Sequence, residues 1–227
     1  MQAHSWFSEW FNSPYYHLLY SNRDEGEAKQ FINRLIEYLQ PKQEARMLDV
    51  GCGRGRHSRH LATLGFDVTG IDVAPENIQF ANQYASTHLN FQVHDMREPI
   101  QGATFDAVFN LFTSFGYFDT LAENQAVCKA LSTMLTPNGL LVIDFLNATK
   151  VCANLNPAET IAREGVVFEI KRWHNDTHIY KQIEVLAAPN KTQIGIFTER
   201  VQALAKSDFE ALLAADFDII ETFGSYH

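Results

Sequence analysis

The stretch "MLDVGCGRGRHSRHLATLG", residues 47–65, constrains the fold of this chain more than any other part of the sequence. A short apolar run is followed by glycines at alternate positions, Gly51, Gly53 and Gly55, and then by a helical pattern that ends in another glycine. Glycine readily adopts left-handed backbone conformations, and the N–H groups at the start of a helix attract negatively charged ligand groups. The stretch therefore predicts a strand, a glycine loop and a helix that form one wall of a ligand site.

The rhythm of short apolar runs and helical segments continues to Asn147 and predicts an α/β fold with a doubly wound, mainly parallel, Rossmann-like sheet. Apolar residues at helical spacing in the first 40 residues predict a helical lid, with Ser13 as an N-cap before Pro14. Beyond residue 150, β-branched segments separated by turn signals predict an antiparallel β insert. A C-terminal helix and a last strand at 217–226 complete the expected pattern.

We expect a single domain over residues 1–227, because no linker, repeat or low-complexity segment interrupts the chain. Its expected parts follow one another along the sequence: a helical lid at 1–40, a cofactor-binding core at 41–150, the antiparallel insert at 151–205, and a C-terminal helix and strand at 206–227.

The composition disfavours several classes of partner. The net charge of -9 repels the phosphates of nucleic acids, so we expect no nucleic-acid substrate. The cysteines, Cys52, Cys128 and Cys152, form no CxxC pair, which argues against a zinc site or a disulfide framework, and we expect no metal. Neither a signal-peptide pattern nor an apolar run of membrane-spanning length is present, so the expectation is a cytoplasmic location without membrane contact.

Two common nucleotide-binding loops do not fit these glycines. The dinucleotide fingerprint G-x-G-x-x-G/A requires a small third residue, but that position is Arg56 when counted from Gly51 and Ser58 when counted from Gly53. The P-loop pattern, in which Lys and then Ser or Thr follow the last glycine, is absent as well. The loop therefore favours a ligand of another kind.

The segment "DVGCGRG", which begins at Asp49, resembles the first motif of the class I S-adenosylmethionine-dependent methyltransferases, and the resemblance extends from Met47 to Asn147. It implies that S-adenosylmethionine is the cofactor, that S-adenosylhomocysteine is the product, and that the protein is an enzyme. Residues at the ends of the first four strands match the family's cofactor-binding positions: Gly51, Cys52, Gly53, Asp72, Val73, Asp95, Met96 and Asn110. In the family, the second-strand acid binds the ribose hydroxyls, the third-strand pair contacts the adenine, and the fourth-strand residue lies near the methionine moiety.

Methyl transfer from a sulfonium is an in-line displacement, which needs alignment and exclusion of water rather than a nucleophile on the protein. We therefore name no catalytic residue and expect a small-molecule methyl acceptor. Candidates for a lid and for the acceptor side come from two clusters of aromatic residues and a nearby arginine: Tyr16, Tyr20, Arg23, Phe115 and Tyr117. Core packing is the competing explanation for Phe115.

Alternatives stay open from the residues alone. An NADP-binding oxidoreductase would use the cations that crowd the glycine loop, although a solvated helix surface explains them as well. A non-catalytic S-adenosylmethionine-binding module would have the same cofactor residues and no acceptor. The antiparallel insert is expected either to shape the acceptor pocket or to form the interface of a homo-oligomer. The family has a further strand after the one expected at 217–226, so either a tail is missing from this sequence or the sheet edge is open to a partner.

Overall fold

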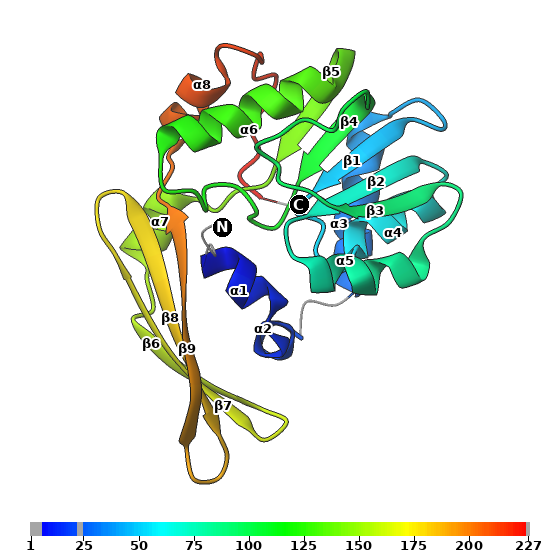
Figure 1. The fold of residues 1–227 in the computed structure, drawn as a ribbon. Coiled ribbons are helices and arrows are strands. Elements are labelled where there is room, and N and C mark those ends of the chain that lie inside the picture. Colours follow the sequence, from blue (N-terminus) through cyan, green and yellow to red (C-terminus); the bar gives the residue numbers. More distant parts are fainter. Residues whose placement is uncertain (1–5, 22–24, 226–227) are drawn as a thin grey trace. The chain divides into compact units, whose positions relative to one another are not determined.

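The computed structural model describes residues 6–21 and 25–225, and these residues form two compact units (Figure 1). The parallel-sheet unit takes its described residues from three ranges: Arg23–Phe115, Asp119–Phe145 and Lys206–His227. The antiparallel-sheet unit takes them from three others: Met1–Asn22, Gly116–Phe118 and Leu146–Ala205. Each unit therefore combines segments that are far apart in the sequence.

Within the described residues, the parallel-sheet unit contains a five-stranded sheet in the order β3-β2-β1-β4-β5, and every neighbouring pair is parallel. Its strands are β1 Arg46–Val50, β2 Asp67–Asp72, β3 Leu89–Val93, β4 Phe105–Asn110 and β5 Leu135–Ile143. The central strands β1 and β4 are almost fully buried, as parallel strands covered on both faces are. The mainly parallel, doubly wound sheet predicted from the sequence is confirmed.

The helices of this unit are α3 Glu25–Leu39, α4 Arg56–Thr63, α5 Pro75–Ala81 with the 3₁₀ helix η1 Asn82–Tyr84, α6 Leu121–Met134, and α8 Lys206–Leu213. Their boundaries follow signals in the sequence. Pro75 is the first residue of α5, and Thr120 and Glu123 form a capping box at the start of α6. The hydrophobic core joins Ile32 of α3 and Leu61 of α4 to the strands of the sheet.

The strand order reverses between β1 and β4, because the chain leaves β1 for β2 on one side and returns to β4 on the other. Open parallel sheets bind ligands beyond the carboxyl ends of their strands at such a reversal. The strand ends that meet this edge are Val50 of β1, Asp72 of β2, Val93 of β3 and Asn110 of β4. The segments that follow these residues are therefore the place to look for a functional site.

The antiparallel-sheet unit contains strands β6 Ala158–Arg163, β7 Val166–His174, β8 His178–Ala187 and β9 Thr192–Gln202, paired in that order, and helices α1 Trp6–Asn12, α2 Pro14–Leu19 and α7 Ala148–Ala153. The predicted antiparallel insert is confirmed. Trp10 of α1 and Leu19 of α2 are buried in one cluster with Phe168, Ile170 and Ile183 of the sheet. The two short helices therefore supply the apolar cover that one face of this sheet requires.

Two expectations differ from the structure. The helices expected as one N-terminal lid fall into both units, since α1 and α2 pack on the antiparallel sheet and α3 packs against α4. The strand expected at 217–226 does not occur in the described residues 217–225. A strand forms only where its N–H and C=O groups pair with a neighbour, and β5 is paired with β4 alone among the described strands. The side chains of Ile220 and Phe223 are accordingly exposed.

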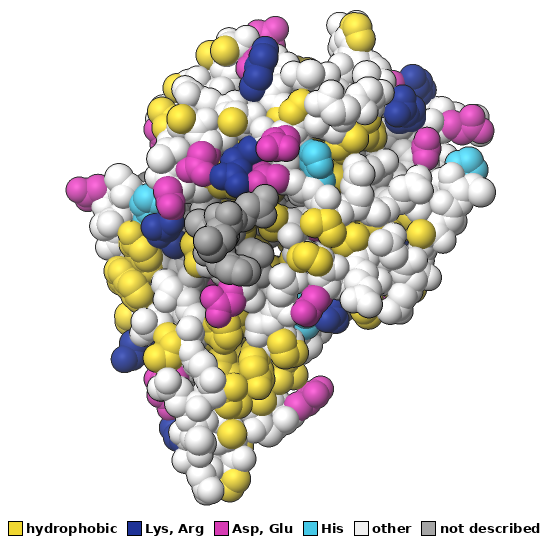
Figure 2. All heavy atoms as spheres, viewed as in Figure 1, with side chains coloured by type: hydrophobic (Ala, Val, Ile, Leu, Met, Phe, Trp, Pro, Cys, Tyr) yellow, Lys and Arg dark blue, Asp and Glu magenta, His cyan; other side chains and the backbone are white. Residues whose placement is uncertain are grey.

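The described residues also bear on partners and metals. None of the helices within 6–21 and 25–225 is long and apolar enough to cross a membrane. In the same part of the chain, no group of His, Cys, Asp and Glu side chains is arranged to hold a metal ion. On the face in Figure 2, the described Lys and Arg side chains are scattered among Asp and Glu rather than gathered in one patch.

Candidate functional site

The glycine loop connects the end of β1 to the start of α4. Gly51, Gly53 and Gly55 have φ angles of 72°, 55° and 78°, in the left-handed region that favours glycine. The N–H groups of Gly51 and Cys52 donate to the carbonyl oxygen of Ile71 over 2.8 and 2.9 Å, which ties the loop to the end of β2. The loop therefore has a fixed shape at the edge where the strand order reverses.

A Cβ atom added to each of these glycines would meet a different environment. At Gly51 it would lie 2.5 Å from the hydroxyl oxygen of Ser114, and at Gly55 it would lie 2.6 Å from the Phe91 ring. At Gly53 no atom of the described residues would lie within 4 Å of it. Gly51 and Gly55 thus make room for neighbouring side chains, whereas the backbone at Gly53 faces open space in which a ligand can approach it.

Cys52 contributes its backbone to the loop, because its side chain is buried in the core of the parallel-sheet unit. Burial raises the pKa of the Cys52 thiol well above its usual value, and the nearby carboxylates of Asp49 and Asp72 raise it further. The thiol is therefore neutral and poorly nucleophilic. This agrees with a residue selected for small size between two glycines.

The carboxylate of Asp72, at the end of β2, holds the glycine loop from the other side. Its Oδ2 accepts from the N–H of Gly53 over 2.8 Å, and its Oδ1 accepts from the N–H of Ala74 over 2.8 Å. Burial raises the pKa of Asp72, and hydrogen bonds from Ala74, Gly53 and Asn77 oppose that rise. Since a carboxylate has about four acceptor sites, these contacts still leave one for a ligand hydroxyl. Val73 follows it and is half-buried.

Asp49, the acid before the glycines, lies below the loop and faces the protein interior. It is buried, and the hydroxyl of Ser58 on α4 donates to its Oδ2 over 2.5 Å. Burial raises the pKa of Asp49 to about 6, although the hydrogen bonds from Ser58 act in the opposite direction. Asp49 therefore ties β1 to α4, and this contact explains an acidic residue at this position without contact to a ligand.

Asn110, at the end of β4, has one buried side-chain atom without a hydrogen-bond partner among the described residues. Its Nδ2 donates to the carbonyl oxygen of Val50 over 3.2 Å, which orients the amide. Its Oδ1 is buried and has no hydrogen-bond partner among the described residues. A buried acceptor left unpaired costs about 1–3 kcal/mol, so an N–H donor would stabilise this oxygen, and a ligand would reach it only after the covering atoms move aside.

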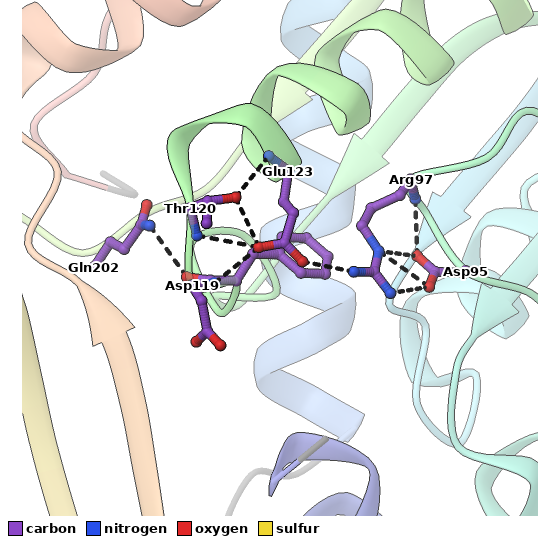
Figure 3. A network of polar contacts seen from close by, with 7 residues as sticks. Asp95, Arg97, Asp119, Thr120, Glu123 and Gln202 are labelled. Carbon is purple, nitrogen blue, oxygen red and sulfur yellow. Dashed lines mark hydrogen bonds and ion pairs between the residues drawn. The ribbon is translucent and has the colours of Figure 1, made fainter. Parts of the chain in front are cut away.

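Asp95, two residues beyond β3, is held by a guanidinium (Figure 3). The backbone N–H and the Nε of Arg97 donate to its Oδ1 over 2.9 and 3.1 Å, and Nη2 donates to its Oδ2 over 2.6 Å. Burial of Asp95 acts to raise its pKa, but the hydrogen bonds and charge of Arg97 outweigh it and lower the pKa. The carboxylate is therefore charged and fixed in orientation.

The structure brings several of the predicted residues together. A Cβ added to Gly51 would lie 3.9 Å from the Cε of Met96 and close to Ser114. The segments that follow β1, β3 and β4 therefore meet beside the glycine loop, while Asp72 connects the end of β2 to it. Four strand ends that are separate in the sequence form one continuous edge.

A strained turn after β4 was not foreseen from the sequence. Phe112 and Thr113 have φ angles of 56° and 61°, a region that is costly for bulky or β-branched residues. The N–H of Phe112 donates to Oδ2 of Asp144, just beyond β5, over 3.0 Å, and the hydroxyl of Ser114 donates to the carbonyl oxygen of Gly51 over 3.4 Å. Strain of this kind is retained where surrounding contacts fix it, often at functional sites. Nothing in the local sequence pattern marks such a turn.

His57, one of the histidines near the glycine loop, is buried and stacks on the ring of Phe112 with the ring centres 4.8 Å apart and the planes at 15°. Burial lowers the pKa of His57 to about 3, and the positive charges of Arg56 and His60 lower it further. At neutral pH the imidazole is therefore uncharged. It supports the strained turn and presents no cation to a ligand.

The arginines beside the loop also have structural contacts within their unit. The guanidinium of Arg54 lies 4.5 Å from the centre of the Phe80 ring, and that of Arg59 lies 3.6 Å from the centre of the Tyr84 ring. Arg59 also forms an ion pair of 3.0 Å with Glu25. Arg54 in the glycine loop and Arg59 on α4 thus have partners within the protein that do not require a phosphate, which weakens the case for an NADP site.

The residues expected on the acceptor side divide between the two units. Tyr16 and Tyr20 belong to the antiparallel-sheet unit, where the centres of their rings lie 4.9 Å apart. Tyr117 belongs to the same unit and packs on Trp6 and Phe11. Phe115 belongs to the parallel-sheet unit, where it is fully buried beside Phe209. Arg23 lies outside the described residues. Each described aromatic ring therefore has a packing role within its own unit.

Comparisons with known proteins agree on one family. A family model described as a methyltransferase domain matches residues 41–186. A Bacillus subtilis protein named as the methyltransferase YqeM is 37% identical over 124 residues, 53% of this chain and 49% of that protein. A ubiquinone biosynthesis O-methyltransferase of Xanthomonas axonopodis is 30% identical over 154 residues, 64% of this chain and 60% of that protein. The chain thus spans about half to three fifths of the length of these curated relatives.

The fold agrees with the sequence comparisons. The solved structure of CalS10, an amino pentose methyltransferase of Micromonospora echinaspora with S-adenosylmethionine bound, superposes with a TM-score of 0.69 at 25% identity, over 90% of this chain and 88% of that one. The family match covers more than half of the sequence and includes the whole glycine loop. The chain therefore belongs to the methyltransferase domain family, within the class I methyltransferases that use S-adenosylmethionine as their cofactor.

Proposed function

We propose that this protein transfers the methyl group of S-adenosylmethionine to a small-molecule acceptor. The observation that carries the proposal is the edge formed by the ends of β1, β2 and β4. There the backbone at Gly53 faces open space, the Asp72 carboxylate holds the loop, and Asn110 has a buried oxygen without a partner among the described residues. These three features support a site for a ligand that carries hydroxyl and ammonium groups, as this cofactor does.

The residues that would hold the cofactor follow from their chemistry. Asp72 has an acceptor site for the ribose hydroxyls, Asp95 and Met96 suit an adenine, and the oxygen of Asn110 suits the ammonium of the methionine moiety. Backbone from Gly51 to Gly53, with Cys52 and the adjacent Val73, would line the approach. The cofactor supplies an electrophilic methyl group on a sulfonium. The protein's task is to align donor and acceptor and to exclude water.

A small acceptor is supported by the charge of the protein and by its relatives. A net charge of -9 opposes binding of a polyphosphate backbone. Among the relatives, one is named for ubiquinone biosynthesis and one for an amino pentose. We include Tyr16, Tyr20, Arg23, Phe115 and Tyr117 as acceptor-side candidates and assign no catalytic residue. A cytoplasmic location and association of copies through the antiparallel sheet likewise stay predictions.

Calorimetry and turnover test the proposal together. We expect S-adenosylhomocysteine to bind the wild type, and Asp72→Ala to weaken that binding at least about tenfold, because a charged acceptor of the ribose is lost. Asp106→Ala is the matched control, since Asp106 lies near the amino end of β4 and binds Lys42 and the backbone of Arg46. Production of S-adenosylhomocysteine from S-adenosylmethionine is then measured over a panel of small hydroxyl and amine compounds.

The outcomes separate the alternatives. Binding without turnover over the whole panel would favour a non-catalytic binding module. A change in nicotinamide fluorescence when NADPH is added, with no binding of S-adenosylhomocysteine, would favour an oxidoreductase. Equal affinity of Asp72→Ala and the wild type for S-adenosylhomocysteine would refute the assignment of the ribose site.

A further inference from the structure

Arg97 forms hydrogen bonds with both oxygens of the Asp95 carboxylate, which the proposed function assigns to the adenine (Figure 3). Its backbone N–H reaches Oδ1 of Asp95 over 2.9 Å, and its Nη2 reaches Oδ2 over 2.6 Å. Its Nε lies 3.1 Å from both oxygens and bridges them. These contacts fix both the position of the carboxylate and the rotation of its plane, because donors act on each oxygen from defined directions.

The hydrogen bonds from Arg97 do not use every acceptor site of the Asp95 carboxylate. An ionised carboxylate has two oxygens and about four lone-pair sites. Three N–H donors of Arg97 make four hydrogen bonds to the Asp95 carboxylate, two on each oxygen, because the single Nε–H is shared between Oδ1 and Oδ2. Three hydrogens against about four lone-pair sites leave room for about one further N–H group. The 6-amino group of adenine offers an N–H donor, whereas the 6-oxo group of hypoxanthine offers an oxygen.

Arg97 is itself anchored on its other side. Its Nη1 donates to Oε1 of Glu123 over 2.7 Å, while Oε2 of Glu123 accepts from the N–H of Asp119 over 3.2 Å and from the N–H of Thr120 over 3.1 Å. Glu123 is thus a member of the capping box that starts α6. Because one carboxylate oxygen binds the helix terminus and the other binds Arg97, the guanidinium is attached to a rigid element and not to a loop.

The location of this network relative to the glycine loop follows from the next residue. Met96 lies between Asp95 and Arg97, and its Cε would lie 3.9 Å from a Cβ added to Gly51. The segment that Arg97 organises therefore lies beside the loop proposed to bind the cofactor. Hydrogen bonds to Asp95 raise the pKa of Arg97, and the pKa of Asp95 is lowered, so both groups are charged at neutral pH.

We propose that Arg97 is a positioning residue for base recognition: it orients the Asp95 carboxylate so that its remaining acceptor site selects adenine over hypoxanthine. This inference rests on the proposed function, because it requires the cofactor to bind at this edge. Arg97 acts through Asp95 and need not touch the cofactor. The guanidinium fork is essential to this role, since the point charge of a lysine cannot engage both carboxylate oxygens from fixed directions.

The test compares the affinities of two ligands for each variant. Calorimetry gives the dissociation constants of S-adenosylhomocysteine and of its deaminated analogue S-inosylhomocysteine, and their ratio measures base selectivity. In the wild type we expect the analogue to bind at least about tenfold more weakly, because its 6-oxo group faces a carboxylate oxygen. Arg97→Met is expected to reduce this ratio about three- to tenfold, and Arg97→Lys to stay closer to Arg97→Met than to the wild type.

The ratio is insensitive to partial misfolding, because an inactive fraction of protein affects the titrations with both ligands equally. Arg46→Met is the matched control, because Arg46 is an arginine of the same unit at the start of β1, where its guanidinium lies 5.6 Å from the centre of the Phe105 ring and, among the described residues, forms no hydrogen bond with a proposed cofactor residue. It is expected to keep the wild-type ratio. Asp95→Asn is expected to lose the selectivity as well.

Each result has one reading. Loss of selectivity in both Arg97 variants, with Arg46→Met unchanged, supports the proposal. A wild-type ratio in Arg97→Met or in Arg97→Lys overturns it and leaves the proposed function intact. A wild-type ratio in Asp95→Asn overturns the assignment of Asp95 together with the role of Arg97. Failure of the wild type to bind S-adenosylhomocysteine overturns the proposed function and, with it, this inference.

Discussion

Gly53→Ala and Gly65→Ala form a matched pair that separates backbone strain from ligand contact. Both glycines have positive φ angles, 55° at Gly53 and 93° at Gly65, and at neither would a new Cβ have an atom of the described residues within 4 Å. Alanine in a left-handed conformation costs about 1–2 kcal/mol. For a chain of this size, each kcal/mol lowers the unfolding midpoint by about 2–4 °C. Both variants are therefore expected to unfold a few degrees below the wild type.

The two variants are expected to differ in ligand binding. Gly53 lies in the loop between β1 and α4, whereas Gly65 follows the C-cap of α4 and precedes the amino end of β2, the end opposite to the one that forms the site. A methyl group added where a bound cofactor approaches the backbone overpacks the complex by about 1–3 kcal/mol. This corresponds to a loss of about 5- to 150-fold in affinity. Gly65→Ala is expected to bind like the wild type.

Thermal unfolding and calorimetry with S-adenosylhomocysteine provide both readouts on the same samples. The expected pattern is a similar fall in the midpoint for the two variants and a fall in affinity for Gly53→Ala alone. If Gly53→Ala binds S-adenosylhomocysteine as tightly as Gly65→Ala, the open space at Gly53 is not where the ligand approaches, and the reasoning from this loop fails.

Three further substitutions test other parts of the structure. Burial raises the pKa of Asp49 from 3.8 to about 6, so the folded protein keeps a proton that the unfolded chain releases, and the wild type loses stability as the pH rises from about 4 to 6. Asp49→Asn should therefore have a free energy of unfolding higher than that of the wild type by up to about 3 kcal/mol at pH 8, and this difference should close toward pH 4. A constant gap across this range would contradict the buried carboxylate. Thr120→Ala removes the capping box and should lower the free energy of unfolding by about 1 kcal/mol and the midpoint of thermal unfolding by about 2–4 °C, whereas Thr120→Ser should keep both. Equal midpoints for the two variants would count against the cap. Tyr20→Phe should lower the free energy of unfolding in chemical denaturation by about 1–3 kcal/mol, because the Tyr20 hydroxyl donates to Glu199 over 2.7 Å and accepts from Lys181 over 2.6 Å. An unchanged free energy of unfolding would show that these contacts do not stabilise the unit.

The order of strands and helices is readable from the sequence because it depends on local patterns. Buried parallel strands give apolar runs, and glycine or proline marks many of the turns and helix starts between them. The chemistry at the strand ends is also local: Asp72 and Asn110 each follow an apolar run, so their place at the sheet edge follows from the strand itself. This is why the parallel sheet and the edge that forms the candidate site could be predicted.

Features that depend on contacts between distant segments could not be predicted in the same way. The periodicity of the first 40 residues identifies an apolar helix face but not its partner, and the structure divides these helices between two units. Arg97 reads as an ordinary loop cation until folding brings it to Glu123 on α6. The segment beyond residue 217 contains β-branched and aromatic residues typical of strands, yet in the described residues it pairs with no strand, although β5 has β4 as its only neighbour there.

The packing of α1 and α2 on the antiparallel sheet has a consequence for synthesis of the protein. About 140 residues separate the end of α2 from the start of β6, and at about 5–20 residues per second the ribosome needs on the order of ten seconds to make them. Trp10 and Leu19 leave the ribosome long before Phe168 and Ile183, the side chains that bury them. During this interval the apolar faces of the two helices lack their native cover, and transiently exposed apolar surface of this kind is prone to aggregation.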